Sequence, residues 1–185
     1  MKRLLDLFLA IISIVIFLIP LLIIYFSIKI STKGKALYWS DRVGKDNKIF
    51  KMPKFRTMVI DTPELATDKL QDPNQWLTPI GYFLRKSSLD ELPQIFCVLV
   101  GKMSFVGPRP ALYNQDELIK MRTQKGIHRL LPGITGWAQI NGRDTLKLND
   151  KVEYDNFYLL KKSFLFDIEI LFKTITKVLS ADGVR

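Results

Sequence analysis

The sequence predicts an α+β fold that is mostly helical, and three observations support this class. A long apolar segment without charge, Leu7–Ile28, predicts one N-terminal helix. Two short segments, Ala36–Asp41 and Ile49–Val59, flank a turn-like segment at Gly44–Asn47 and predict a β-hairpin. Later segments repeat apolar residues with the period of a helix. The 185 residues suffice for one small domain with an anchor.

The composition excludes several classes of protein. The chain carries 28 Lys and Arg against 18 Asp and Glu, a net charge of +10, and 48% of its residues are hydrophobic. It is therefore neither disordered nor collagen-like. A single cysteine excludes an internal disulfide, and a single histidine excludes a multi-histidine metal centre. Any bound metal must be held by oxygen ligands, which favours magnesium, manganese or calcium.

The N-terminal apolar segment is long enough to cross a membrane. As a straight helix, Leu7–Ile28 would be roughly 33 Å long. It is too long for the apolar part of a signal peptide, and no small-residue cleavage site follows it. Pro20 divides it into two parts, and neither part spans a bilayer alone.

Positive charge flanks both ends of this segment, with Lys2 and Arg3 before it and Lys29, Lys33 and Lys35 after it. The positive-inside rule places both ends in the cytoplasm. A re-entrant helix kinked at Pro20 satisfies these observations, and a single-pass helix with a proline kink is the alternative. The residues alone leave both open.

Basic residues are concentrated just after the anchor. Lys29–Arg56 contains nine basic residues and two acidic ones, and so carries most of the net charge. Such a cluster attracts anionic lipids or a phosphorylated substrate. Nucleic acid is a weaker interpretation, because no nucleic-acid-binding motif accompanies the charge.

The elements after the hairpin follow from local signals. Pro53 makes the second strand an edge strand or a loop, and Asp61–Gln75 is polar and irregular. Thr78-Pro79 predicts the start of a short helix towards Arg85. Further helices are predicted for 88–99, 114–125, 150–158 and 164–179. The last has an apolar stripe suited to core packing or to an in-plane membrane helix, formed by Ile168, Leu171, Phe172, Ile175 and Leu179.

Asp90 and Glu91 are the most informative polar pair. The pattern Ser88-x-x-Glu91 matches a capping box, which predicts that both acids lie in the first turn of a helix. The helix dipole there favours ionised carboxylates, as a nucleophile or a magnesium ligand requires. Plain capping is the alternative. Arg109 lies between Pro108 and Pro110, and this rigid frame suits bidentate phosphate binding.

Four motifs then stand in order behind the proline-broken anchor: Lys54–Met58, Ser88–Gln94, Met103–Pro110 and Pro132–Arg143. Together they resemble the bacterial sugar transferase family, the small monotopic phosphoglycosyl transferases. The resemblance covers essentially the whole chain. It implies transfer of a sugar 1-phosphate from a UDP-sugar to undecaprenyl phosphate or another polyprenyl phosphate, with release of UMP and a requirement for Mg²⁺.

The resemblance also implies roles for individual residues. Asp90 would be the nucleophile that forms a phosphosugar-aspartyl intermediate and would contact the metal, and Glu91 would position the metal or handle a proton. Asp167 matches an acidic residue that orients the site, or is a helix-terminal acid. Phosphate-binding residues would be Arg85 and Arg109, with Lys54, Arg56 and Arg143 as weaker candidates.

The resemblance favours re-entry, with Pro20 as the helix-breaking residue. It implies a re-entrant membrane helix over 1–30 and a cytosolic, membrane-associated catalytic domain over 31–185, on the cytoplasmic face of a bacterial inner membrane. Two positions depart from the family: Ile19, where serine is often found, and Leu131, where a basic residue is common. The sugar, the pathway and the oligomeric state stay open. The rival hypothesis is a non-catalytic module that binds anionic lipid or an assembly partner.

Overall fold

The computed structural model describes residues 1–60, 62, 72–142 and 145–179. These residues form a mostly helical structure with a short β-hairpin and one long apolar N-terminal helix, which confirms the predicted class. Arg143 and most of the predicted irregular segment Asp61–Gln75 lie outside the described residues.

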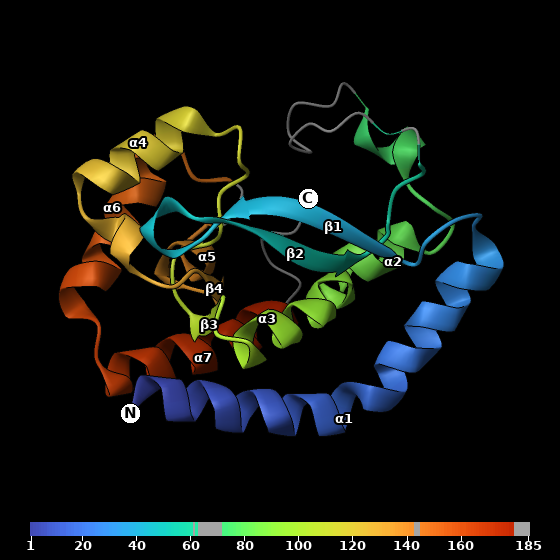
Figure 1. Ribbon diagram of the computed structural model, residues 1–185, viewed down its shortest axis with the longest axis horizontal. Coiled ribbons are helices and arrows are strands. Elements are labelled where there is room, and N and C mark those ends of the chain that lie inside the picture. The colour runs from blue at the N-terminus through green and yellow to red at the C-terminus, as the bar shows by residue number, and fades with distance from the viewer. Residues whose placement is uncertain (61, 63–71, 143–144, 180–185) are drawn as a thin grey trace.

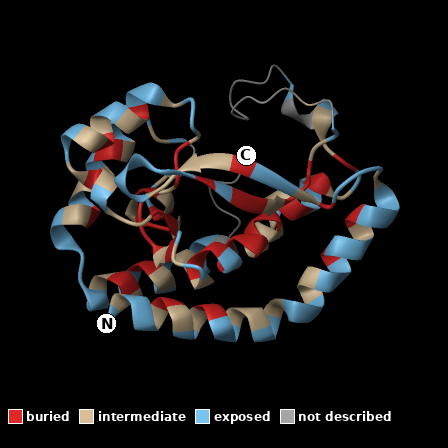
Figure 2. Cartoon of the chain, viewed as in Figure 1, coloured by how far each residue is buried: buried red, intermediate tan, exposed pale blue. Residues whose placement is uncertain are grey.

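The N-terminal helix α1 (Lys2–Ser31) is longer than predicted and continues through Pro20. By length and composition it could cross a membrane. Its ribbon curves along one side of the domain in Figure 1, and Figure 2 shows exposed residues along much of it. Many of these exposed residues are large and apolar, for example Phe8, Val15 and Phe26.

Both ends of α1 are attached to the rest of the chain. At its start, Lys2 forms an ion pair with Asp167, and the buried Asp6 carboxylate accepts hydrogen bonds from Ser104 Oγ and the Phe105 N–H. In its second half, Ile24 and Ile28 are buried in a cluster with Ala36, Phe55 and Leu84. The helix therefore contacts one domain near both of its ends.

The predicted hairpin is confirmed as β1 (Leu37–Val43) and β2 (Ile49–Phe55), joined through η1 (Lys45–Asn47). The strands are antiparallel, with Leu37 opposite Phe55 and Val43 opposite Ile49. Strand β2 contains Pro53, opposite Trp39. Among the described residues, no third strand pairs with the hairpin at this position, so no partner needs the N–H that proline lacks. The strand ends at Phe55, four residues before the predicted end.

The segment that carries Asp90 departs from the predicted capping box. After η3 (Pro73–Trp76) and α2 (Gly81–Lys86), η4 (Leu89–Gln94) is a 3₁₀ helix that leads into α3 (Ile95–Leu99). Ser88 adopts φ 56° and ψ 16°, and its side chain makes no capping hydrogen bond. Pro93 has no N–H for an α-helical bond to Leu89, which explains why this turn is not regular α-helix.

A pair of parallel strands escaped prediction. β3 (Ser104–Val106) pairs with β4 (Gly133–Thr135), with Ser104 opposite Gly133 and Val106 opposite Thr135. Each strand has only three residues, too few for a recognisable alternating pattern. The pair joins two of the sequence motifs.

The remaining predicted helices are confirmed. The ends of α4 (Asp116–Gln124) and α6 (Leu148–Lys161) are shifted, and α7 (Phe164–Leu179) has the predicted ends. Short turns η5 (Ile127–Arg129) and α5 (Trp137–Ile140) lie between α4 and α6. In α7, Ile170 is fully buried, whereas Phe172 and Ile175 of the predicted apolar stripe are exposed. Much of that stripe therefore does not pack in the core.

Candidate active site

Asp90 and Glu91 lie in the first turn of η4, which packs against strand β2. Ser88 adopts the left-handed conformation at the point where the chain leaves α2 and enters η4. Both carboxylates are largely buried, with 8% and 9% of their residue surfaces exposed. The predicted placement of both acids in the first turn is confirmed, although Glu91 does not close a capping box.

The Glu91 carboxylate is held by two cations from distant parts of the chain. Its Oε1 accepts from Lys54 Nζ at 2.8 Å and from an Arg109 terminal nitrogen at 2.9 Å. Lys54 is on β2, and Arg109 is in the loop after β3. Burial lowers the pKa of Lys54, and the negative charge of Glu91 opposes this effect. Glu91 therefore forms ion pairs with both Lys54 and Arg109, which were expected to bind phosphate.

The Asp90 carboxylate differs from its neighbour. Within the ranges that the structure describes, no hydrogen bond or ion pair engages it. Burial raises the pKa of Asp90, and the nearby Glu91 charge raises it further, whereas Lys54, Arg85 and Arg109 lower it. A buried carboxylate without a partner is costly, which is typical of a group reserved for a ligand or a reaction.

Arg85, on α2, interacts electrostatically with Asp90. Its Nε donates to Thr57 Oγ1 at 3.0 Å, and one of its terminal nitrogens lies 3.4 Å from Met58 Sδ. Burial lowers the pKa of Arg85, while the charge of Asp90 raises it. The Lys54–Met58 motif therefore holds Arg85 through Thr57 and Met58. Of the arginines near Asp90, Arg85 has the largest electrostatic effect on its pKa.

Arg42 is a further cation of the site that sequence reasoning missed. It is half-buried, its Nε donates to Ser40 Oγ at 2.9 Å, and a terminal nitrogen donates to the Pro110 carbonyl at 3.2 Å. Burial, followed by the charge of Arg109, lowers the pKa of Arg42 to about 10. The hairpin register could have identified it, because Arg42 and Lys54 fall on the same face.

The loop that carries Arg109 is fixed by close backbone contacts. The Gly107 N–H donates to the Thr135 carbonyl, and the Gly133 N–H donates to the Pro108 carbonyl, both at 2.9 Å. A Cβ atom at Gly133 would lie 2.2 Å from Gly107 N. This approach requires glycine, so the Met103–Pro110 and Pro132–Arg143 motifs form one packed unit.

Two predicted site residues lie elsewhere. Arg56 donates to Thr32 Oγ1 near the end of α1, and its buried Nε lacks a partner among the described residues. Asp167 accepts from Tyr158 Oη and from Lys2 Nζ, each at 2.7 Å. None of the contacts described for these two residues reaches Asp90. Arg143 lies outside the described residues.

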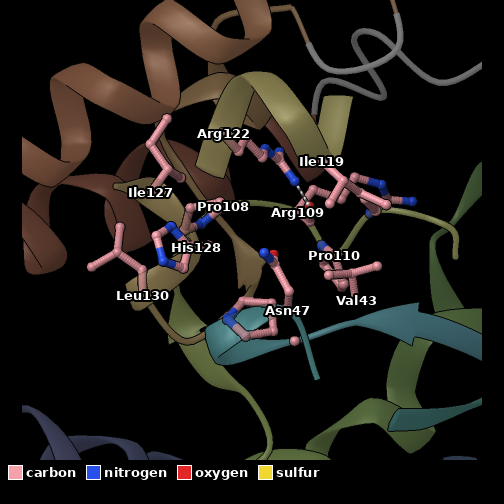
Figure 3. Close-up of a pocket in the computed structure, with 13 residues that line it drawn as sticks. Val43, Asn47, Pro108, Arg109, Pro110, Ile119, Arg122, Ile127, His128 and Leu130 are labelled. Carbon is pink, nitrogen blue, oxygen red and sulfur yellow. Dashed lines mark hydrogen bonds between the residues drawn. The ribbon is translucent and has the colours of Figure 1, made fainter. Parts of the chain in front are cut away.

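A small cavity lies behind the Arg109 loop, between η1, α4 and η5 (Figure 3). Its volume of about 30 Å³ leaves space for water but not for a nucleotide. His128 lines this cavity, and its buried Nδ1 has no described partner. The cavity is therefore not a substrate site, and Arg109 turns its charged end towards Glu91.

Comparison with known proteins places these motifs in context. The bacterial sugar transferase family model matches residues 1–181. The UDP-glucose:undecaprenyl-phosphate glucose-1-phosphate transferase of Escherichia coli (strain K12) is 40% identical over 186 residues, covering 96% of this chain and 40% of that protein. The UDP-galactose-lipid carrier transferase of Erwinia amylovora is 38% identical over 199 residues, covering 99% of this chain and 41% of that protein.

A shorter relative matches over nearly its whole length. The uncharacterised sugar transferase EpsL of Bacillus subtilis (strain 168) is 38% identical over 185 residues, covering 100% of this chain and 90% of that protein. The chain thus spans about two fifths of the two longer relatives and most of this shorter one.

Proposed function

This chain belongs to the bacterial sugar transferase family, and from that membership we propose that it transfers a sugar 1-phosphate from a UDP-sugar to undecaprenyl phosphate and releases UMP. The names of relatives that act on undecaprenyl phosphate support this reaction. The observation that carries the proposal is the Asp90 carboxylate, which is buried, has no described partner and is surrounded by positive charge.

The charge balance suits a diphosphate substrate. Four cations, Arg42, Lys54, Arg85 and Arg109, lie around two carboxylates. Because the cations outnumber the acids, the site attracts anions. Phosphoryl transfer depends mainly on such neutralisation and on alignment of the reacting groups.

In the first step, an Asp90 oxygen attacks the β-phosphorus of the donor. A bond forms between that oxygen and phosphorus, and the phosphoanhydride bond to the α-phosphate breaks. UMP leaves with the bonding electron pair, and Asp90 carries the sugar phosphate as an acyl phosphate. Lys54 and Arg109, released in part from Glu91, neutralise the transferred phosphoryl oxygens.

In the second step, a phosphate oxygen of the polyprenyl acceptor attacks the same phosphorus. The bond between phosphorus and the Asp90 oxygen breaks, which restores the carboxylate and yields a polyprenyl diphosphate sugar. The bond between the sugar carbon and its oxygen is not broken in either step. Glu91 keeps the surrounding cations in position throughout.

The residues present fit a magnesium ion that is shared with the substrate. Among the described residues, no three His, Cys, Asp or Glu side chains cluster to form a protein cage. Mg²⁺ commonly binds through one or two carboxylates together with substrate phosphates. Asp90 would supply the protein ligand, and the metal would add charge neutralisation at the donor diphosphate.

We infer further that α1 is re-entrant, with its kink at Pro20, and that the domain lies on the cytoplasmic face of a bacterial inner membrane. Contacts of Lys2, Asp6 and Ile28 with one domain support this arrangement, because a spanning helix would separate its ends. Exposed apolar side chains on other helices would lie in the same surface, including Tyr82, Phe83, Phe96, Val100, Phe172 and Ile175. The basic residues of Lys29–Arg56 would then meet anionic lipid headgroups.

A donor panel tests the reaction. The purified full chain in lipid nanodiscs is incubated with UDP-sugars, undecaprenyl phosphate and Mg²⁺, and UMP is measured. Without acceptor, a donor labelled in its β-phosphate should leave label on the wild-type protein and none on Asp90→Asn. Absence of UMP with every donor would favour the lipid-binding or partner-binding module instead.

A further inference from the structure

We propose that the buried ion pair between Arg122 and Asp155 is a positioning device for Arg109. The proposal rests on the proposed function, because Arg109 acts there on the donor phosphates. Neither Arg122 nor Asp155 belongs to the four sequence motifs that indicated the site. The pair acts on Arg109 through the backbone and does not touch the reacting groups.

The contacts form a continuous chain from α6 to the Arg109 loop. Asp155 on α6 and Arg122 on α4 are 1% and 7% exposed. Asp155 Oδ2 accepts from Arg122 Nε at 2.9 Å and from one terminal nitrogen at 2.6 Å. The other terminal nitrogen of Arg122 donates to the Arg109 carbonyl at 2.8 Å, drawn as a dashed line in Figure 3.

A hydrogen bond to the Arg109 carbonyl restricts the whole loop. Pro108 and Pro110 restrict the backbone on both sides of Arg109, so few rotations remain there. Fixing the carbonyl direction fixes the direction in which the Arg109 side chain leaves the backbone. The Pro110 carbonyl is held from the hairpin by Arg42 at 3.2 Å. The buried Arg122 and the half-buried Arg42 thus hold adjacent carbonyls of the loop.

The geometry of Arg122 requires a guanidinium. Two of its nitrogens face Asp155 and the third faces the Arg109 carbonyl, in one rigid plane. A lysine keeps the charge but lacks this fork, so it cannot reproduce all three directed bonds.

The same two helices provide a matched control. Lys125 on α4 pairs with Glu153 on α6 at 2.7 Å, with both side chains substantially exposed. This pair joins the helices as the buried pair does, but its ion-pair contact does not extend to the Arg109 loop. Lys125→Met therefore removes a link between α4 and α6 while leaving Arg109 held.

The test is a double-mutant cycle on UMP release, with donor varied at saturating acceptor. Arg122→Lys should lower kcat/KM for the donor by about ten- to a hundredfold, as misplacement of a binding group does. In an Arg109→Lys background, the same change should cost less than about twofold, because the group that it positions is already altered. Lys125→Met should leave kcat/KM within about twofold in both backgrounds.

A second variant distinguishes loss of positioning from loss of folding. Arg122→Met combined with Asp155→Leu removes both buried charges, and such apolar replacements are often tolerated. It should unfold at a temperature near that of the wild type and lose the same activity as Arg122→Lys. Equal losses from Arg122→Lys in both backgrounds would overturn the proposal, as would wild-type kcat/KM in the apolar double variant.

Binding of UDP with Mg²⁺ separates this proposal from the proposed function. Equilibrium dialysis should show weaker UDP binding for Arg122→Lys and for Arg109→Lys. The variant that combines these two substitutions should bind UDP about as weakly as Arg109→Lys alone. If the wild type releases no UMP, the proposed function fails, and UDP binding still tests the positioning role. Unchanged UDP affinity in Arg122→Lys would overturn the positioning role, whatever the wild-type turnover.

Discussion

The Glu91 carboxylate and the Arg109 guanidinium form an ion pair across the site, with 2.9 Å between Oε1 and the nearest nitrogen. Asp90, one residue earlier, has no described partner. Two adjacent acids thus have different environments: Glu91 organises the cations, and Asp90 remains available. The effects expected for Asp90, Arg109 and Lys54 variants follow from this difference between the two acids.

Asp90→Asn should abolish turnover while leaving the protein folded. Asparagine keeps the volume of the side chain but removes the negative charge that attacks phosphorus in the proposed mechanism. UMP release should fall to background, and the thermal unfolding midpoint should stay within a few degrees of the wild type. Asp116→Asn, an exposed acid on α4, is the matched control and should retain full activity. Normal turnover in Asp90→Asn would remove it as the nucleophile.

Arg109→Lys should lower kcat/KM for the donor by about tenfold or more, because a point charge does not reproduce a planar fork. The lysine also loses the guanidinium contact with Glu91, whose ion pair with Lys54 is retained. Steady-state kinetics with varied donor measure the effect. Wild-type constants in this variant would show that Arg109 does not hold the donor phosphates.

The profile of kcat/KM against pH should be bell-shaped. Its acidic limb should lie at higher pH, and its alkaline limb at lower pH, than ordinary carboxyl and lysine groups would give. Burial raises the pKa of Asp90, so activity should be lost on the acidic side at a higher pH than for an ordinary carboxyl group. Burial lowers the pKa of Lys54, so its positive charge should be lost at a lower pH than for an ordinary lysine.

Lys54→Arg should move the alkaline limb to higher pH, because arginine stays protonated. Lys51→Arg, an exposed change on the same strand, is the control and should leave the profile unchanged. The measurement is log kcat/KM against pH for the three proteins. An alkaline limb that does not move in Lys54→Arg would assign that limb to another group.

Both ends of α1 should react from the cytoplasmic side. In a Cys97→Ser background, cysteines introduced in an N-terminal tag and at Lys33 should react with an impermeant maleimide only after cells are lysed. Pro20→Ala should expose a fraction of the tag in intact spheroplasts, because it restores a regular helix. Labelling of one wild-type end in intact spheroplasts would indicate a single-pass helix.

The sequence predicted elements that depend on local patterns. The hairpin and the helices at 116–124, 148–161 and 164–179 follow from turn residues and periodicity, so they were found with small errors at the ends. The β3–β4 pair was missed because each strand has only three residues and the strands come from distant parts of the chain, held together by contacts such as that between Gly107 and Gly133. Such pairing depends on tertiary packing, which no local window contains.

The same contrast between local patterns and tertiary packing explains why only part of the site was predicted. The motifs identified Asp90 and Glu91, and five basic residues were assigned to phosphate; the structure brings three of these, Lys54, Arg85 and Arg109, close to the two acids. Arg42 was missed because its place depends on the hairpin register and on the Pro110 carbonyl. The capping-box pattern was misleading, because Glu91 finds stronger charged partners on β2 and in the Arg109 loop.

The ion pair between Lys2 and Asp167 joins a helix made early to a helix made late in translation. When α1 leaves the ribosome, α7 has not been synthesised, and the first turn lacks the acid that holds it. The apolar helix is therefore complete before the domain can close around its start. If α1 enters the membrane as proposed, it does so before this closure, and a chain released before its last helix is complete would lack the acid that holds the first turn of α1.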